Sequence, residues 1–237
     1  GIEILTETAV EQVSLKDNSV HVEINTKNKK ETLTATKVLS AVGIVANIEN
    51  IGLEALKINT DNGKIAVNEY YETNLANHFA IGDVVSGPAL AHVASAEGII
   101  CVEKIAGHSP EPLNYDNIPG CTYCYPEIAS VGITEEQAIQ NGKEIKVGKF
   151  PFSASGKASA AGKKEGFVKM IYDAKYGELL GAHMIGFNVT EMIAEIVAAR
   201  KLETTGYEIL KTVHPHPTMS EAVMEATAAA FDEVIHL

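Results

Sequence analysis

Residues 78–85 read HFAIGDVV, and this stretch indicates the fold most clearly. Its apolar residues predict a short strand that ends at Gly82-Asp83, and a Gly-Pro pair then opens a helix predicted over 89–106. A strand that runs into a helix is typical of α/β sheets, which bind ligands at the carboxyl ends of their strands. A lone Gly-Asp is more often only a turn. The helix behind it favours a ligand site, because its N–H groups and positive dipole end would point toward the same crevice.

Upstream of this stretch, the sequence predicts a β-meander followed by a short helix and a tight turn. The third strand of the meander loses its alternation at VLSAVG (38–43), which predicts a strand buried on both faces and ending at Gly43. The predicted strands cover 8–15, 19–26 and 31–42, with turns at Asp17-Asn18 and Asn28-Lys29-Lys30, a short helix within 47–60 and a turn at Asp61-Asn62-Gly63.

Downstream, residues 108–119 contain three of the eight prolines, which predicts a linker and a domain boundary. Beyond it the pattern changes to α+β. Strands are predicted at 122–133, 145–152, 166–173 and 178–186, with a hairpin at Lys175-Tyr176-Gly177, a helix with a capping box from Thr134 to Asn141-Gly142, a helix over 190–202 and a last helix after Thr218.

Composition excludes several classes of protein. The 237 residues carry 19 basic and 31 acidic side chains, a net charge of −12, and no basic patch, so we expect no nucleic-acid partner. No apolar run is long enough for a membrane span, and the first residues do not resemble a signal peptide. Three cysteines argue against a secreted disulfide scaffold and favour a reducing compartment.

The cysteines themselves predict no metal or redox centre. Cys121-x-x-Cys124 is a weak zinc signal, because a closed zinc site needs four ligands and the sequence offers no second pair. We expect these two thiols to be buried or half-buried in a sheet. We expect Cys101 to lie on the apolar side of its helix and to belong to the protein core.

Near the C-terminus the chain reads HPHPTMSE (214–221), in which prolines flank His216 and Glu221 follows five positions later. Prolines exclude a helix there and fix the direction of the backbone. From spacing alone, Thr218 and Glu221 form a capping box, in which Glu221 would reach back to a backbone N–H. Glu221 could instead bond to His216, and its two oxygens could share both roles. We expect His214 to be structural.

Three motifs together resemble the pyridine nucleotide-disulfide oxidoreductase family. The segment from Thr73 to Asp83, with GPALAHVASAEG after it, resembles the family's second FAD motif. CTYCYPEIASVGITEEQA (121–138) resembles the start of its interface domain, and HPHPTMSEA its C-terminal His-Glu signature. The resemblance implies that His216 is the acid/base toward a dithiol substrate, with Glu221 orienting its ring. It also implies FAD contacts at Asp83, Ala89, Leu90, Ala91 and His92, and an NAD contact at Gly43.

The family also needs two glycine-rich dinucleotide fingerprints and a Cys-x-x-x-x-Cys pair, and none of these occurs in the sequence. We therefore expect the chain to be the C-terminal half of a longer enzyme with Rossmann-like FAD and NAD domains. The expected divisions are the tail of an NAD-binding domain (1–46), the returning segment of an FAD-binding domain (47–112), and an α+β interface domain with an antiparallel sheet (113–237).

The function implied by the resemblance is FAD-dependent, NAD-linked oxidation of protein-bound dihydrolipoyl groups by a homodimer. Its partner would be a lipoyl-bearing acyltransferase or another lipoyl carrier protein, in the bacterial cytoplasm or the mitochondrial matrix. The chain alone is expected to dimerise without turnover. Two alternatives stay open: another disulfide reductase of the family, acting on glutathione disulfide, and a non-catalytic dimerisation module.

Overall fold

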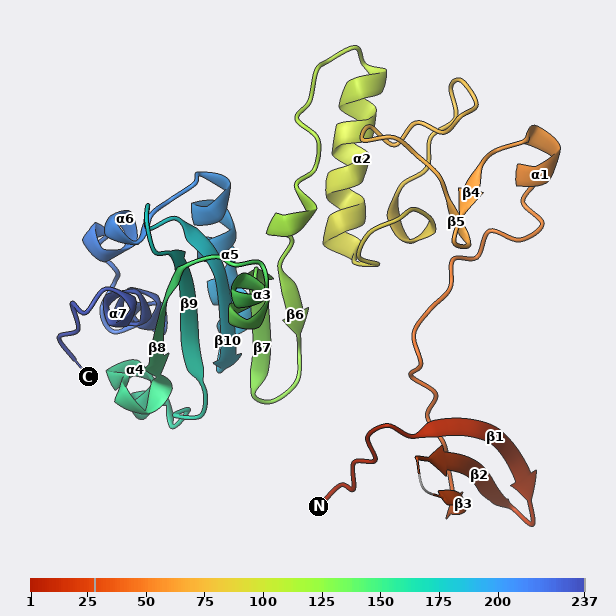
Figure 1. Cartoon of the computed structure of the whole chain (residues 1–237), viewed down its shortest axis with the longest axis horizontal. Helices are drawn as coiled ribbons and strands as arrows, with labels where there is room; N and C mark the ends of the chain where they lie inside the picture. Colours follow the sequence, from red (N-terminus) through yellow and green to blue (C-terminus); the bar gives the residue numbers. More distant parts are fainter. Residues whose placement is uncertain (28, 237) are drawn as a thin grey trace. The chain divides into compact units, whose positions relative to one another are not determined.

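The computed structural model describes residues 1–27 and 29–236, which divide into two compact units, Gly1–Asn47 and a second that begins at Ile48. The first unit is an antiparallel sheet in the order β1-β2-β3 (Figure 1). It confirms the first two predicted strands, and Asp17 and Asn18 both have positive φ in the turn between them. Asn28, in the second predicted turn, lies outside the described residues. The strands are β1 (Ala9–Lys16), β2 (Ser19–Thr26) and β3 (Lys29–Ala35).

The buried strand predicted to end at Gly43 is wrong. Strand β3 ends at Ala35, and residues 37–43 form no strand. Leu39 is 90% exposed and Val42 is 93% exposed. A strand needs a hydrogen-bonded neighbour, and burial of both its faces needs further layers that cover the sheet. No described strand pairs with this segment.

The second unit begins with small elements and one long helix. A short helix α1 (Leu53–Leu56) precedes the hairpin of β4 (Thr60–Asp61) and β5 (Lys64–Ile65), which confirms the predicted turn. The strand predicted at 78–81 is wrong: Phe79 forms a single bridge with Glu72, and a 3₁₀ turn, η1 (Gly82–Val84), follows. The predicted helix is confirmed as α2 (Ala91–Ile105).

The remainder of the second unit is built on a five-stranded antiparallel sheet in the order β6-β7-β10-β9-β8 (Figure 1). The predicted hairpin is present, and so are the three predicted helices, which are α3, α5 and α7. Helices α4 and α6 were not predicted. The run 122–133 is divided by a turn into the end of β6 and β7. The elements are η2 (Tyr115–Asn117), β6 (Gly120–Thr122), β7 (Glu127–Gly132), α3 (Glu135–Gln140), β8 (Ile145–Pro151), η3 (Phe152–Ala154), α4 (Gly156–Ala161), β9 (Phe167–Asp173), β10 (Leu179–Gly186), α5 (Val189–Lys201), α6 (Gly206–Lys211) and α7 (Glu221–Ala230).

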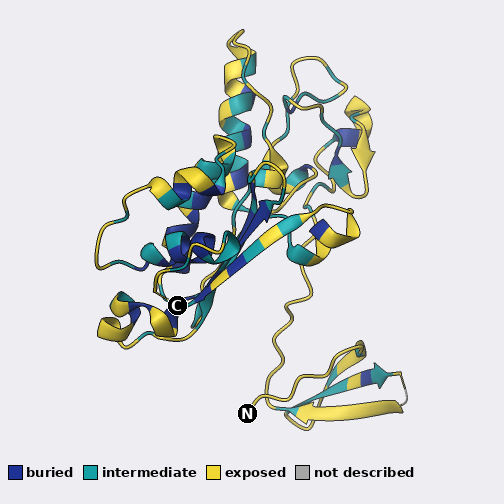
Figure 2. Ribbon diagram, turned by 60° about the vertical axis from the view of Figure 1, so that its left-hand side comes forward, coloured by how far each residue is buried: buried dark blue, intermediate teal, exposed yellow. Residues whose placement is uncertain are grey.

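One face of this sheet holds the core. Alternate residues of β9 (Val168, Met170, Tyr172) belong to a single buried cluster with side chains of α5 and α7, as expected when successive strand residues point to opposite faces. Helix α5 packs on β7 and β10, and α7 packs on β8 and β9. Figure 2 shows buried positions gathered in this sheet and its helices, whereas the N-terminal meander is mostly exposed. Within the described residues, no helix has the length and apolar character that crossing a membrane requires.

A hydrogen bond in this core gives the first testable prediction. Tyr172 Oη lies 2.7 Å from Thr227 Oγ1, and since Thr227 donates its own hydrogen to the Val223 carbonyl, Tyr172 is the donor. Replacing Tyr172 with Phe should lower the free energy of unfolding by about 1 kcal/mol, the net value of one buried hydrogen bond. Urea unfolding measures it. Tyr207→Phe, on the exposed ring of α6, is the control, and equal losses in the two variants would contradict the prediction.

Candidate functional site

The loop between α6 and α7 presents the His216–Glu221 pair. His216 Nδ1 lies 2.8 Å from Glu221 Oε1, and the Thr218 N–H donates to Glu221 Oε2 at 2.7 Å. One oxygen of Glu221 therefore bonds the ring and the other reaches back to a backbone N–H. The predicted capping box is only half formed, because Ser220 is the N-cap of α7 and no side chain caps that helix. The Thr218 hydroxyl donates to the Pro215 carbonyl, which closes the loop on itself. Side-chain and backbone bonds thus fix the orientation of the imidazole.

The geometry determines which ring nitrogen is available for chemistry. A carboxylate can only accept hydrogen bonds, so Nδ1 of His216 carries the proton that bonds Glu221. In the neutral ring this leaves a lone pair on Nε2. The His216 side chain is 78% exposed, so a substrate can reach that nitrogen. An oriented, accessible imidazole with a carboxylate behind it is suited to take a proton from a thiol.

Glu221 is held ionised beside the histidine. Partial burial of Glu221 opposes its ionisation, but the Thr218 N–H and the His216 ring outweigh that effect and lower the pKa of the carboxyl below its usual value. A charged Glu221 stabilises the imidazolium that forms when His216 accepts a proton.

His214, the first histidine of the motif, points away from this pair and into the fold. Its Nε2 lies 2.8 Å from Glu195 Oε1 on α5, and its side chain is only 5% exposed. The hydrogen bond to Glu195 raises the pKa of His214, although burial works against this. The pair anchors the proline loop to α5, in agreement with the structural role expected from the sequence.

The His214–Glu195 pair predicts a dependence of stability on pH. Because the folded-state pKa of His214 is raised, protonation stabilises the fold fully below about pH 6.5, the unfolded value, and this contribution is lost as pH rises through the folded pKa. Thermal melts of the wild type and His214→Gln should therefore differ most near pH 5.5 and least near pH 9. A difference that grows with pH would refute the assignment.

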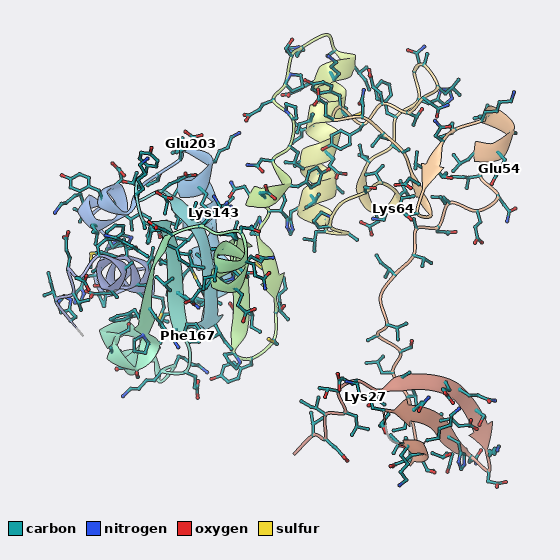
Figure 3. The ribbon with its side chains drawn as sticks, in the orientation of Figure 1. Lys27, Glu54, Lys64, Lys143, Phe167 and Glu203 are labelled. Atoms are coloured by element: carbon teal, nitrogen blue, oxygen red, sulfur yellow. The ribbon has the colours of Figure 1, made fainter. Side chains whose placement is uncertain are left out.

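The predicted flavin edge lies around η1 and the start of α2. Asp83 is exposed and makes no hydrogen bond within the described residues. Gly82 has φ 74°, and a Cβ there would lie 3.3 Å from the Ala94 Cβ, so the turn needs glycine at this position. Lys64, labelled in Figure 3, donates to the Val85 carbonyl at 2.8 Å and holds the far side of the turn.

Residues 89–92 differ in what they offer to a ligand. The Leu90 N–H is already bonded to the Pro88 carbonyl, and the His92 ring lies 3.1 Å from the Pro119 carbonyl. The backbone N–H groups of Ala91 and His92 have no acceptor within the described residues. A free carboxylate beside two free N–H groups at a helix N-terminus fits the hydroxyl and phosphate or carbonyl groups of a flavin dinucleotide.

The structure does not gather all the predicted site residues into one place. The cavity that His216 and Glu221 line, about 170 Å³, contains neither Asp83 nor any residue of 89–92. Gly43 belongs to the N-terminal unit, where it is exposed with φ 106°, and its NAD contact stays a prediction. In the described residues the predicted site therefore forms three separate groups: the His216–Glu221 pair, the turn at Asp83 with residues 89–92, and Gly43.

The cysteines agree with the prediction in two of three cases. Cys101 is buried and Cys121 is half-buried, and burial raises the pKa of both thiols. Cys124 is exposed, contrary to expectation, because it lies in the turn after β6, where its Sγ faces the Pro126 carbonyl at 3.0 Å.

Comparison with known proteins gives matches along nearly the whole chain. Residues 1–98 match the sequence family "Pyridine nucleotide-disulphide oxidoreductase", and residues 118–227 match its dimerisation domain. Dihydrolipoyl dehydrogenases of Zymomonas mobilis and Bacillus subtilis are 50% and 48% identical over all of this chain. The match covers 51% and 50% of those two proteins. The chain thus spans about half the length of the curated relatives it matches.

Solved structures agree in fold. LpdA from Mycobacterium tuberculosis superposes with a TM-score of 0.86 at 23% identity, covering 93% of this chain and 48% of that one. The flavoprotein disulfide reductase RclA from Escherichia coli superposes with a TM-score of 0.83 at 24% identity, covering 93% and 50%.

Proposed function

Because the chain belongs to the pyridine nucleotide-disulphide oxidoreductase family, whose members use FAD and NAD(P), we propose that it is part of a dihydrolipoyl dehydrogenase. This enzyme oxidises protein-bound dihydrolipoyl groups to lipoyl groups and reduces NAD⁺. Identity of 48–50% to dihydrolipoyl dehydrogenases over the whole chain supports the proposal. The observation that carries it is the hydrogen bond between His216 and Glu221, which leaves an exposed nitrogen free to act as a base.

The proposed role of this chain is proton transfer. A thiol near pKa 8.5 is a weak nucleophile until it loses its proton, and Nε2 of His216 accepts that proton. Oxidation of two thiols to a disulfide releases two electrons and two protons, and a hydride transferred to NAD⁺ carries both electrons with one proton. His216 returns the other proton to solvent. Glu221 holds the ring in the productive tautomer throughout and stabilises its charged form.

Asp83 and the N–H groups of Ala91 and His92 are the residues proposed to hold FAD. Bound FAD supplies the two-electron relay between the thiols and NAD⁺. Asp83 would accept hydrogen bonds from its hydroxyl groups, and the helix N-terminus would face its acceptor atoms. Leu90, whose N–H is already bonded to the Pro88 carbonyl, and Ala89 complete the proposed contact with FAD. Gly43 would approach NAD.

We further propose the organisation expected from the sequence: an NAD-domain tail (1–46), a returning FAD-domain segment (47–112) and an interface domain (113–237). The compact unit that ends at Asn47 and the dimerisation-domain match that begins at residue 118 support it. The protein would act as a homodimer on a lipoyl-bearing acyltransferase or another lipoyl carrier protein. Its bacterial relatives favour the bacterial cytoplasm.

Substrate choice tests the proposed function. The full-length protein that carries this chain, loaded with FAD, should reduce NAD⁺ with dihydrolipoamide and show no comparable oxidation of NADH or NADPH by glutathione disulfide. Preference for glutathione disulfide would assign it to another disulfide reductase. Turnover of neither substrate by a folded, FAD-loaded dimer would leave only the dimerisation module.

A further inference from the structure

Glu97 is a buried carboxylate that the proposed chemistry does not use. It lies in the middle of α2 and is 1% exposed, in line with the buried Val93 and Cys101 one turn to either side. Burial of a carboxylate is costly unless hydrogen bonds compensate it. Both oxygens of Glu97 accept hydrogen bonds, one from the Gly82 N–H and one from the Tyr115 hydroxyl.

One oxygen of Glu97 holds the turn that presents Asp83. The Gly82 N–H donates to Glu97 Oε2 at 2.6 Å, which joins η1 to the second turn of α2. Because Gly82 directly precedes Asp83, this bond limits where the Asp83 carboxylate can lie. The N–H groups of Ala91 and His92 start the same helix, so Glu97 fixes Asp83 relative to them.

The other oxygen of Glu97 joins η1 to the segment just before the match to the dimerisation domain, which begins at residue 118. Tyr115 Oη donates to Glu97 Oε1 at 2.6 Å, and Tyr71 Oη lies 3.2 Å from Tyr115 Oη. Tyr115 has one hydroxyl hydrogen, already given to Glu97, so Tyr71 is the donor to Tyr115. The hydrogen bonds therefore run in one direction, from Tyr71 through Tyr115 to Glu97. Burial and the carboxylate raise the pKa of Tyr115, so it stays protonated and remains a donor.

Tyr115 is itself held by contacts from two directions. Its ring packs on Gly87, where an added Cβ would lie 3.0 Å from Tyr115 Cε1. Its 3₁₀ turn is bonded to α5, because Arg200 donates to the Asp116 carbonyl at 2.8 Å and Asn117 Nδ2 donates to the Val197 carbonyl at 3.0 Å. A rigidly placed hydroxyl is thus presented to Glu97.

We propose that Glu97 and Tyr115 are positioning residues for FAD, which fix the Gly82–Asp83 turn against the N-terminus of α2 and so set the affinity for the cofactor. This inference rests on the proposed flavoenzyme function. Neither side chain needs to touch the cofactor. Both act through the backbone of Gly82, and Tyr115 acts by keeping Glu97 in place.

The test measures FAD binding by the full-length protein after the cofactor has been removed. Tyr115→Phe keeps the ring but leaves Glu97 Oε1 without a donor, and Glu97→Ala releases the Gly82 N–H. Each should weaken FAD binding about tenfold or more and alter the visible circular dichroism of bound flavin. Glu97→Gln can still accept from Gly82 and donate to Tyr115, so it should bind within about threefold of wild type. Tyr207→Phe, far along the chain on exposed α6, is the control.

The outcomes are distinct. If Tyr115→Phe and Glu97→Ala melt at lower temperature without FAD but bind FAD with wild-type affinity, the residues are structural only and the inference is wrong. If Glu97→Ala does not fold, the FAD affinities of Tyr115→Phe and Glu97→Gln still test the inference. Wild-type affinity in Tyr115→Phe would refute it. If the folded wild-type protein binds no FAD, the proposed function itself fails, and the inference fails with it.

Discussion

Replacing His216 with Gln in the full-length protein is expected to lower kcat for dihydrolipoamide oxidation by about 10²–10⁴-fold, the usual contribution of a positioned base. Glutamine cannot take up a proton at neutral pH, so the thiol must lose its proton to water. The fold should be unaffected, because the His216 side chain is 78% exposed and the Thr218–Glu221 bond does not depend on it. Steady-state assays with saturating NAD⁺ measure the effect.

The matched control is His108→Gln, at an exposed histidine in the loop after α2. It should retain wild-type kcat, FAD content and melting temperature. Equal activity in His216→Gln and His108→Gln would show that His216 is not the base. A loss of FAD or of stability in His216→Gln would mean that the lost activity reports on structure instead.

The second large effect is expected from Gly148→Ala, in the middle of β8. A Cβ at this position would lie 1.8 Å from the Ala226 carbonyl oxygen and 2.5 Å from the Ala230 nitrogen. Both are backbone atoms of α7, so no side-chain rotation relieves the clash, and the whole helix must move. The free energy of unfolding should fall by about 3 kcal/mol or more, at the upper end for overpacking. Glu221 begins α7, so activity should fall as well.

Gly156→Ala provides the control for that substitution. Gly156 begins α4, and an added Cβ there meets nothing within 4 Å. Alanine at this position should leave stability unchanged or raise it by about 0.5–1 kcal/mol. Urea unfolding followed by far-UV circular dichroism compares the two variants. Similar midpoints would show that β8 and α7 do not pack as closely as the structure indicates.

The sequence predicted the strands of the region that matches the dimerisation domain well and those N-terminal to it less well, for a physical reason. Strands β7 to β10 pair in one sheet within the described residues, and one face of that sheet is buried, so their alternation corresponds to a real buried face. The apolar runs at 38–43 and 78–81 also predicted strands, but no described strand pairs with either. Alternation and apolar runs show what a segment can bury, and only the rest of the protein determines whether it does.

Among site residues, local spacing predicted only part of what the structure shows. Spacing alone favoured a capping role for Glu221, and the bond to His216 was implied by the family resemblance; the structure shows that Glu221, at the start of α7, makes both contacts. Glu97 left a signal that was missed, since a carboxylate stands in the apolar stripe of α2 between Val93 and Cys101. The His214–Glu195 contact joins residues 19 positions apart on separate elements, and spacing alone could not reveal it.

Rapid-mixing measurement of flavin reduction, with dihydrolipoamide and with NADH as separate reductants, tests most directly whether His216 is the base for the dithiol. In His216→Gln, reduction by dihydrolipoamide should slow about 100-fold or more while reduction by NADH keeps its wild-type rate, because only the thiol must be deprotonated. Unchanged reduction by dihydrolipoamide, or equal slowing with both reductants, would contradict a role for His216 as the base that activates the thiol.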